Sequence, residues 1–323
     1  MELQRYKKVG KMKQKWIFIL KGFLLLSAML FLFGGQTASA HFSTPAVVST
    51  DWLEANSDLH NLVVLDIRTS AEYEADHISG AINEPFEVPF SAWITMRDDL
   101  LLELPDKDNL FSAIGALGIT KRSFVVVVTQ GASQPPYPLA NATRVADTLI
   151  YAGVKNVTIL DGGYAKWVEE GKATTQDVPS ITPVTLRGNV NHRMFVTVDY
   201  VYRQINKRRG GAILIDARDA DVYNGLVIEP WADQPGHIPT AVSLPTPLIW
   251  NENGTYKSHE ELQELAKSVI GNNRHQEIII YCGVGGYASS WWYVLTQELG
   301  YTNVKIFDGA AQEWVKYYDM VLD

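Results

Sequence analysis

The only cysteine of the chain lies in the stretch IIIYCGVGGYASSWW, which spans Ile278–Trp292. The apolar run before Cys282 is typical of a buried strand, and the glycine-rich turn after it opens into a helical pattern. Such a corner directs several backbone N–H groups and a helix N-terminus at one point, which favours an anion and lowers the pKa of a cysteine. We therefore predict that Cys282 is a reactive thiol in an active site.

The loop after this cysteine is rich in glycine and carries no Lys or Arg. Glycine supplies the backbone conformations that a loop needs to wrap its N–H groups around an anion. The residues expected to surround the sulfur are Gly283, Val284, Gly285, Gly286, Tyr287 and Ala288. Cysteine phosphatases need an arginine at the position of Ala288, so phosphoryl transfer is disfavoured. The alternative is a buried, inert cysteine beside an ordinary glycine-rich loop.

The sequence also repeats itself at a spacing near 150 residues. Five blocks recur in the same order, namely residues 48–53 and 196–201, 63–68 and 213–218, 76–81 and 236–241, 124–128 and 278–281, and 153–162 and 300–309. Five ordered matches indicate a duplication. The repeat predicts a first domain at residues 41–171, a linker at 172–192 and a second domain at 193–323.

Each copy alternates short apolar strands with helical patterns. Ser258 and Glu261 form the pattern of a capping box before an amphipathic stretch that ends at Gly271, and a second helical pattern ends near Gly300. Continuous apolar strands indicate a mostly parallel sheet covered by helices on both faces. The predicted fold class is therefore α/β. The copies differ by insertions, which lie at residues 85–105 in the first and 224–235 in the second.

The first forty residues have the pattern of an export signal. Basic residues precede and interrupt an apolar run from Trp16 to Phe33, and small residues stand at Ala38 and Ala40. We expect a signal peptide at residues 1–40 and export to the periplasm or the cell exterior. An uncleaved membrane anchor is the alternative, although Lys21 shortens the apolar run.

Charge restricts the partners of the remaining chain. Residues 1–40 hold seven of the 28 basic and one of the 36 acidic residues, which leaves 21 basic and 35 acidic residues and a net charge of −14. This balance argues against nucleic acid and against anionic membrane surfaces as partners. A single cysteine cannot form an internal disulfide, and the scattered histidines show no metal-ligand spacing. We expect no metal and no cofactor.

The repeat and the cysteine loop together resemble the tandem-domain rhodaneses, the thiosulfate and 3-mercaptopyruvate sulfurtransferases. The resemblance covers residues 45–320. Its markers are the Asp-x-Arg strand ends at Asp66 and Asp216, the His-Ile-x-x-Ala turns at His77 and His237, the loop from Cys282 to Tyr287, and the Asp-Gly turns at Asp161 and Asp308 with Trp167 and Trp314 downstream.

The resemblance implies that the second domain is catalytic and that Cys282 carries sulfur as a persulfide. In the first domain the equivalent position is Thr129, which cannot hold a persulfide. The implied reaction moves a sulfane sulfur from a small-molecule donor, such as thiosulfate or 3-mercaptopyruvate, to a thiol or cyanide-type acceptor. A thioredoxin-like reductant is a further expected partner. A sulfur-carrier or binding module without turnover is the alternative.

The loop and the cleft depart from the family pattern in ways that leave the donor open. Val284 replaces the hydroxyl residue of mercaptopyruvate-type loops, and Trp231 stands where a second cleft arginine is expected. Arg218 fits the first cleft arginine, and Arg218 and Trp231 are the possible substrate-binding residues, although an ion pair with a neighbouring carboxylate would explain Arg218 equally well. His77 and His237 open tight turns, where histidine more often satisfies local backbone groups than does catalysis.

Overall fold

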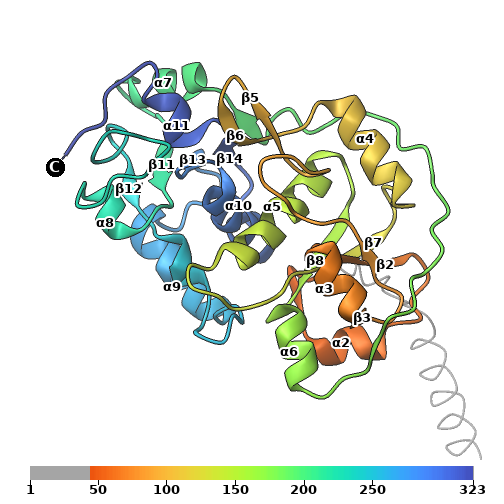
Figure 1. The fold of residues 1–323 in the computed structure, drawn as a ribbon. Coiled ribbons are helices and arrows are strands. Elements are labelled where there is room, and N and C mark those ends of the chain that lie inside the picture. Colours follow the sequence, from red (N-terminus) through yellow and green to blue (C-terminus); the bar gives the residue numbers. More distant parts are fainter. Residues whose placement is uncertain (1–43, 323) are drawn as a thin grey trace, which may run out of the picture. The chain divides into compact units, whose positions relative to one another are not determined.

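The computed structural model describes residues 44–322, and the expected export signal at residues 1–40 lies outside them. Within the described range, no helix is both long enough and apolar enough to cross a membrane. Two parallel five-stranded sheets form the frame of this range (Figure 1).

The two sheets have the same topology. The first has the strand order β1-β8-β7-β2-β4 and the second β10-β14-β13-β11-β12, and all neighbouring strands in both are parallel. The first sheet contains β1 (Val47–Val48), β2 (Leu62–Asp66), β4 (Ile82–Asn83), β7 (Phe124–Val128) and β8 (Asn156–Leu160), and the second contains β10 (Phe195–Val196), β11 (Ile213–Asp216), β12 (Val242–Ser243), β13 (Ile278–Tyr281) and β14 (Val304–Phe307). Equivalent strands occupy equivalent places, so the sequence repeat is a repeat of the fold.

The strand register fixes which loop positions correspond. Asp66 pairs with Val128 in the first sheet, and Asp216 pairs with Tyr281 in the second. The next residues along β7 and β13 are Thr129 and Cys282, which therefore occupy equivalent positions after the central strands, as the sequence predicted.

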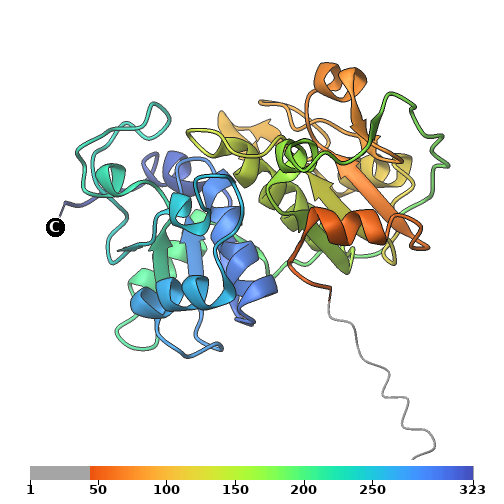
Figure 2. The same ribbon diagram turned by 90° about the horizontal axis from the view of Figure 1, so that it is seen from below.

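Helices cover both faces of each sheet, which confirms the α/β class. The helices of the first half are α2 (Thr50–Ala55), α3 (Ser70–Ala75), α4 (Lys107–Ala116), α5 (Tyr137–Tyr151) and α6 (Gly163–Glu169), and those of the second are α7 (Val198–Ile205), α8 (Ala220–Tyr223), the 3-10 helix η1 (Thr246–Ile249), α9 (His259–Ile270), α10 (Gly286–Tyr293), the π-helical turn η2 (Val294–Glu298) and α11 (Ala310–Trp314). Figure 2 shows the two halves from below, with the first half orange to green and the second teal to blue.

Successive side chains of a strand point to opposite faces of its sheet, and the buried apolar side chains form three clusters. Side chains of α2, α3 and α6 pack on one face of the first sheet, and those of α7 and α11 on one face of the second. The opposite faces of both sheets belong to one continuous apolar cluster that includes α4, α5, α9 and α10. Burial of this shared cluster therefore stabilises both halves together.

The helix signals in the sequence are confirmed with one difference. Ser258 caps α9 and forms the capping box with Glu261, and the helix ends at Gly271, whose φ is 73°. The helix after the cysteine loop already begins at Gly286, and its last part is the π-helical turn η2 before Gly300. Simple periodicity does not distinguish such a turn from a regular α-helix.

The first insertion forms one small antiparallel sheet, and the linker takes part in another. The first insertion forms β5 (Thr95–Arg97) and β6 (Leu100–Glu103), which pair with each other. The predicted linker begins with β9 (Thr174–Thr175), which pairs with β3 (His77–Ile78) of the first half. Farther along it, the Val184 N–H donates to the carbonyl of Gly115 at 2.8 Å. The linker is thus attached to the first half.

Candidate active site

Cys282 follows β13, the middle strand of the second sheet. β13 is fully buried, and Cys282 itself is only 3% exposed. The chain then turns through Gly285, whose φ of 92° is in the left-handed region, and enters α10 at Gly286. Glycine tolerates this conformation without the steric strain of a Cβ atom. The corner predicted from the sequence is therefore present.

The loop donates to the sulfur through its backbone. The N–H of Gly285 lies 3.1 Å from Sγ of Cys282. Burial raises the pKa of the Cys282 thiol and is the largest influence on it. The backbone N–H groups of Ala288, Val284 and Gly285 act in the opposite direction, and the carboxyl group of Glu229 raises the pKa further. The expected lowering of the pKa is therefore wrong, because the enclosure of the sulfur outweighs the loop's N–H groups.

The loop opens onto a cavity of about 280 Å³ that both halves of the chain line. Its walls include four aromatic side chains, which are Phe86, Tyr137, Trp231 and Tyr287. The rings of Tyr137 and Tyr287, one from each half, have centroids 5.8 Å apart. Cys282 and its loop residues Gly283, Val284, Gly286 and Tyr287 all contribute to the wall. The predicted thiol and most of the predicted loop thus line one cavity, whereas Gly285 and Ala288 are not among its lining residues.

Arg218 does not line this cavity, and its guanidinium is held by the protein itself. Nη2 donates to Asp216 at 2.6 Å and to the carbonyl oxygen of Gly236 at 2.7 Å, while Nε bonds the same carboxylate. Its remaining nitrogen, Nη1, is 3.6 Å from Oε2 of Glu229. The first half repeats the arrangement, with Arg68 bonded to Asp66 at 2.7 Å and to the Asp76 carbonyl at 2.8 Å. The structure therefore places Arg218 in an internal ion pair.

Trp231 and Glu229 form the wall opposite the loop. A Cβ atom added to Gly283 would lie 2.1 Å from Nε1 of Trp231 and 2.7 Å from Oε2 of Glu229. This wall therefore contacts the first residue after the cysteine, and only glycine fits there. Burial raises the pKa of Glu229, and the nearby Arg218 guanidinium partly offsets that shift.

Sequence reasoning missed several cavity residues, although it noticed the segments that carry them. Trp231, expected as a possible substrate-binding residue, does line the cavity; the missed residues are Glu229 in the second-copy insertion and Phe86, Val88, Leu101 and Leu102 in the first-copy insertion. The insertions that distinguish the two copies therefore supply part of the cavity wall. Asp219 was missed as well, and it lines the wall one residue after Arg218.

The two turn histidines bond to backbone carbonyls. Nδ1 of His77 lies 2.8 Å from the Tyr73 carbonyl oxygen, and Nδ1 of His237 lies 3.1 Å from that of Tyr223. Each imidazole also stacks on the same tyrosine, with centroids 3.8 and 3.9 Å apart. Their contacts are those of turn-stabilising residues. Among residues 44–322, no group of three or more His, Cys, Asp or Glu side chains could hold a metal ion.

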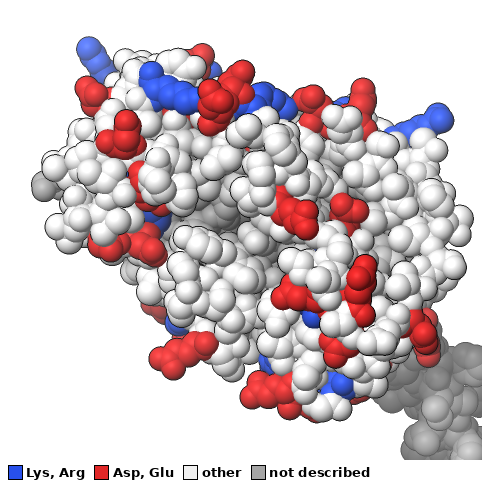
Figure 3. Space-filling model, viewed as in Figure 1, with Lys and Arg blue, Asp and Glu red and all other residues white. Residues whose placement is uncertain are grey.

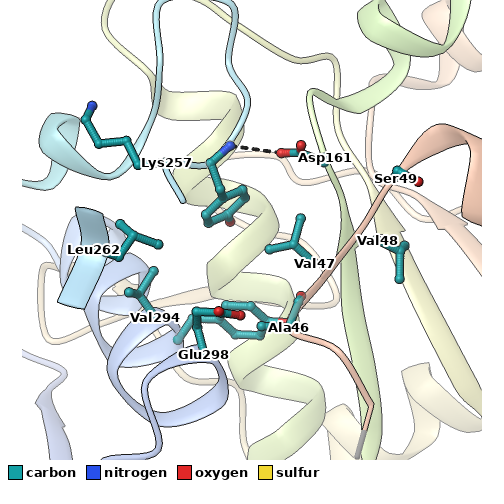
Figure 4. A pocket seen from close by; sticks show the side chains of 11 residues that line it. Ala46, Val47, Val48, Ser49, Asp161, Lys257, Leu262, Val294 and Glu298 are labelled. Carbon is teal, nitrogen blue, oxygen red and sulfur yellow. Dashed lines mark hydrogen bonds between the residues drawn. The ribbon is translucent and has the colours of Figure 1, made fainter. Parts of the chain in front are cut away.

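A second cavity, of about 220 Å³, lies between the halves and holds no cysteine (Figure 4). Asp161 faces it and accepts a hydrogen bond from the backbone N–H of Tyr256 at 2.9 Å. Lys257 points away from Asp161 and donates to the Trp250 carbonyl at 2.7 Å. This cavity offers no nucleophile comparable with Cys282.

Comparison with known proteins identifies the fold and the family. A model of the rhodanese-like domain matches residues 49–170 and again residues 197–317. A Mycobacterium leprae protein named "Putative thiosulfate sulfurtransferase" is 30% identical over 85% of this chain and 95% of its own length. The "Sulfur carrier protein TtuD" of Thermus thermophilus is 30% identical over 83% of this chain and 93% of its own length.

Solved structures agree on the fold. A structure of an EanB variant with a cysteine persulfide and ergothioneine superposes with a TM-score of 0.70 at 20% identity, and the match covers 86% of this chain and 71% of that one. Two matches to one domain model account for the repeat, and the relatives are similar over nearly their full length. The chain therefore belongs to the rhodanese-like family, of whose domain it contains two tandem copies, and its relatives indicate sulfur transfer as its general activity.

Proposed function

We propose that Cys282 carries a sulfane sulfur as a persulfide from a donor, such as thiosulfate or 3-mercaptopyruvate, to a thiol or cyanide-type acceptor. In the first step the thiolate attacks the transferable sulfur of the donor. The donor's bond to that sulfur breaks, and its electron pair leaves with the rest of the donor, as sulfite in the case of thiosulfate. In the second step the acceptor attacks the outer sulfur, and the electron pair of the S–S bond returns to Sγ.

The observation that carries this proposal is the bond from the Gly285 N–H to Sγ of Cys282, at 3.1 Å, in the loop that lines the cavity. A backbone donor at this distance stabilises the negative charge on Sγ in the thiolate, which is the attacking form in the first step and the leaving group in the second. The two curated relatives, a thiosulfate sulfurtransferase and a sulfur carrier by name, support the same chemistry.

A turnover assay of matched variants tests the proposal. Cys282→Ser should lower the transfer rate at least about a thousandfold, because a hydroxyl cannot replace the thiolate as nucleophile and leaving group. Thr129→Ser makes a comparably small change at the equivalent position of the first half and should keep wild-type activity. Full activity of Cys282→Ser would contradict the proposal.

A sulfur carrier without significant turnover is the second candidate. The relative named as a sulfur carrier and the absence of Lys and Arg from the cysteine loop favour it. Steady-state product formation with several donors separates the two functions. One equivalent of bound sulfur without further product would support the carrier, and many turnovers per cysteine would support the enzyme.

Export through residues 1–40 is also part of the proposal. Its basis is the basic, apolar and small-residue order of that segment. N-terminal sequencing of the protein recovered from outside the cytoplasm should begin at His41. Recovery of the intact chain in the membrane fraction would support an anchor instead.

A further inference from the structure

The charges around the Cys282 cavity have the opposite sign to those expected for an anionic substrate. Asp219 and Glu229 line it, and no Lys, Arg or His of the described residues does. The guanidinium nearest the wall, that of Arg218, is shared between Asp216 and Glu229 and is 2% exposed. The three carboxyl groups at or beside the wall, those of Asp216, Asp219 and Glu229, therefore outnumber the single guanidinium of Arg218.

A second guanidinium lies behind the loop, and one of its nitrogens pairs with a carboxylate. Arg144 is fully buried, and its Nη2 donates to Asp308 at 2.8 Å and to the carbonyl oxygen of Leu102. It does not line the cavity. Figure 3 shows that acidic side chains are also spread over one face of the molecule, where a hollow near the middle is bordered mainly by uncharged residues. An anion entering the cavity would therefore meet no Lys, Arg or His side chain of the described chain on the wall, only the backbone N–H groups of the loop.

The aromatic side chains supply a complementary surface for positive charge. The rings of Tyr137 and Tyr287 are tilted by 37° to each other, and Trp231 and Phe86 add two further aromatic side chains to the wall. The acidic group of Asp219 is close enough to Tyr287 to raise its pKa, second only to burial. Aromatic faces beside carboxylates attract ammonium groups through cation–π and Coulomb interactions.

We propose that the sulfur acceptor is a small thiol that carries a positive charge, an aminothiol, held between these aromatic faces and the carboxylates of Asp219 and Glu229. The inference rests on the proposed persulfide function. The thiolate of the aminothiol attacks the outer sulfur of the Cys282 persulfide and forms a new S–S bond. The Sγ–S bond breaks, its electron pair returns to Cys282 as thiolate, and the product is the persulfide of the aminothiol.

The first test measures the charge preference of the cavity without sulfur transfer. The rate of Cys282 modification is compared for 2-aminoethyl methanethiosulfonate, a cation, and 2-sulfonatoethyl methanethiosulfonate, an anion, each normalised to its rate with free 2-mercaptoethanol. We expect the cation to react at least about tenfold faster. Equal rates, or a faster anion, would overturn the inference.

The second test measures transfer from the persulfide. Protein loaded with inorganic polysulfide is desalted and discharged with cysteamine, 2-mercaptoethanol or 3-mercaptopropionate, and each rate is normalised to that thiol's reaction with an uncharged disulfide. The normalised rates should fall in that order. Equal normalised rates for the three thiols, or rates in the opposite order, would contradict an aminothiol acceptor. A protein that never loads would contradict the proposed function instead, while the modification rates would still report the cavity's charge.

Matched variants assign the preference to the carboxylates. Glu229→Gln and Asp219→Asn should each reduce the cation-to-anion ratio several-fold in both tests. Glu264→Gln removes the same charge from the exposed side of α9, where Glu264 pairs with Lys267 at 3.2 Å, and should leave the ratio unchanged. An equal loss of preference in all three variants would show a general charge effect and would overturn the assignment.

Discussion

At the scale of single residues, the two equivalent positions Cys282 and Thr129 meet opposite hydrogen-bonding groups. The sulfur of Cys282 faces the N–H of Gly285, whereas the hydroxyl of Thr129 donates to the carbonyl oxygen of Pro138 at 2.9 Å. An N–H stabilises an anion at its position, and a carbonyl oxygen repels one. The first half has therefore lost both the thiol and the electrostatic setting in which a thiolate would form.

The raised pKa of Cys282 makes its reactivity dependent on pH. The thiolate is the reactive form, so the rate of alkylation by iodoacetamide should keep rising above the pH at which an ordinary thiol levels off. Because the Glu229 carboxyl group raises the pKa, Glu229→Gln should move the profile to lower pH. A profile that levels off near neutral pH would mean that the loop's N–H groups outweigh burial.

At the scale of the element, the loop after β13 depends on two glycines for different reasons. Gly283 leaves room for Trp231 and Glu229, and a Cβ atom there would collide with both. Gly285 instead needs its φ of 92°, and a Cβ atom there would lie 3.2 Å from the Asp308 carbonyl oxygen. The bond from its N–H to the sulfur depends on this conformation.

Gly285→Ala should therefore lower the free energy of unfolding by about 1–2 kcal/mol and slow persulfide formation several-fold. Gly80→Ala is the matched control, because Gly80 has a φ of 78° and its added Cβ would meet nothing within 4 Å. Urea denaturation and donor-loading rates check both variants. Equal loading rates in Gly285→Ala and Gly80→Ala would show that the N–H bond to the sulfur is unimportant.

At the scale of the whole described chain, the two Asp-Gly turns reach across to the opposite half. Asp161 accepts the backbone N–H of Tyr256 at 2.9 Å, and Asp308 accepts that of Leu104 at 3.0 Å. Asp308 has an additional partner in the buried guanidinium of Arg144, at 2.8 Å. Between them, α5 and α10 pack together, with the hydroxyls of Thr143 and Ser290 2.9 Å apart.

This asymmetry predicts unequal effects of the same substitution. Asp308→Asn removes the carboxylate that pairs directly with the buried Arg144 and should lower the free energy of unfolding by about 3 kcal/mol. Asp161→Asn keeps an oxygen that can accept the Tyr256 N–H, so the loss should stay below about 1 kcal/mol. Denaturant unfolding followed by tryptophan fluorescence measures both. Similar losses would contradict a special role for the Arg144 pair.

Much of the fold could be read from the sequence because it depends on local patterns and on the repeat. Apolar strands, the capping box at Ser258 and the paired blocks fixed the α/β class and the equivalence of Thr129 and Cys282. The π-helical turn at the end of α10 was not predicted, because its apolar spacing resembles that of an ordinary helix.

The site could be predicted only in part, because its walls come from distant segments. The cysteine loop is local and was found, whereas Asp219 and Tyr137 meet only through tertiary packing. The sequence left Arg218 undecided between a cleft residue and an ion pair, since only side-chain geometry reveals its two bonds to Asp216. The pKa of Cys282 was predicted in the wrong direction, because burial depends on the complete fold.

The most direct test of the central claim is the mass of the peptide that contains Cys282 after incubation of the protein with a sulfane donor. The proposed function predicts an added mass of about 32 Da, one sulfur atom, on Cys282. The addition should disappear after treatment with a thiol acceptor. A Cys282 peptide that stays unmodified with every donor, while the protein still transfers sulfur, would contradict the claim.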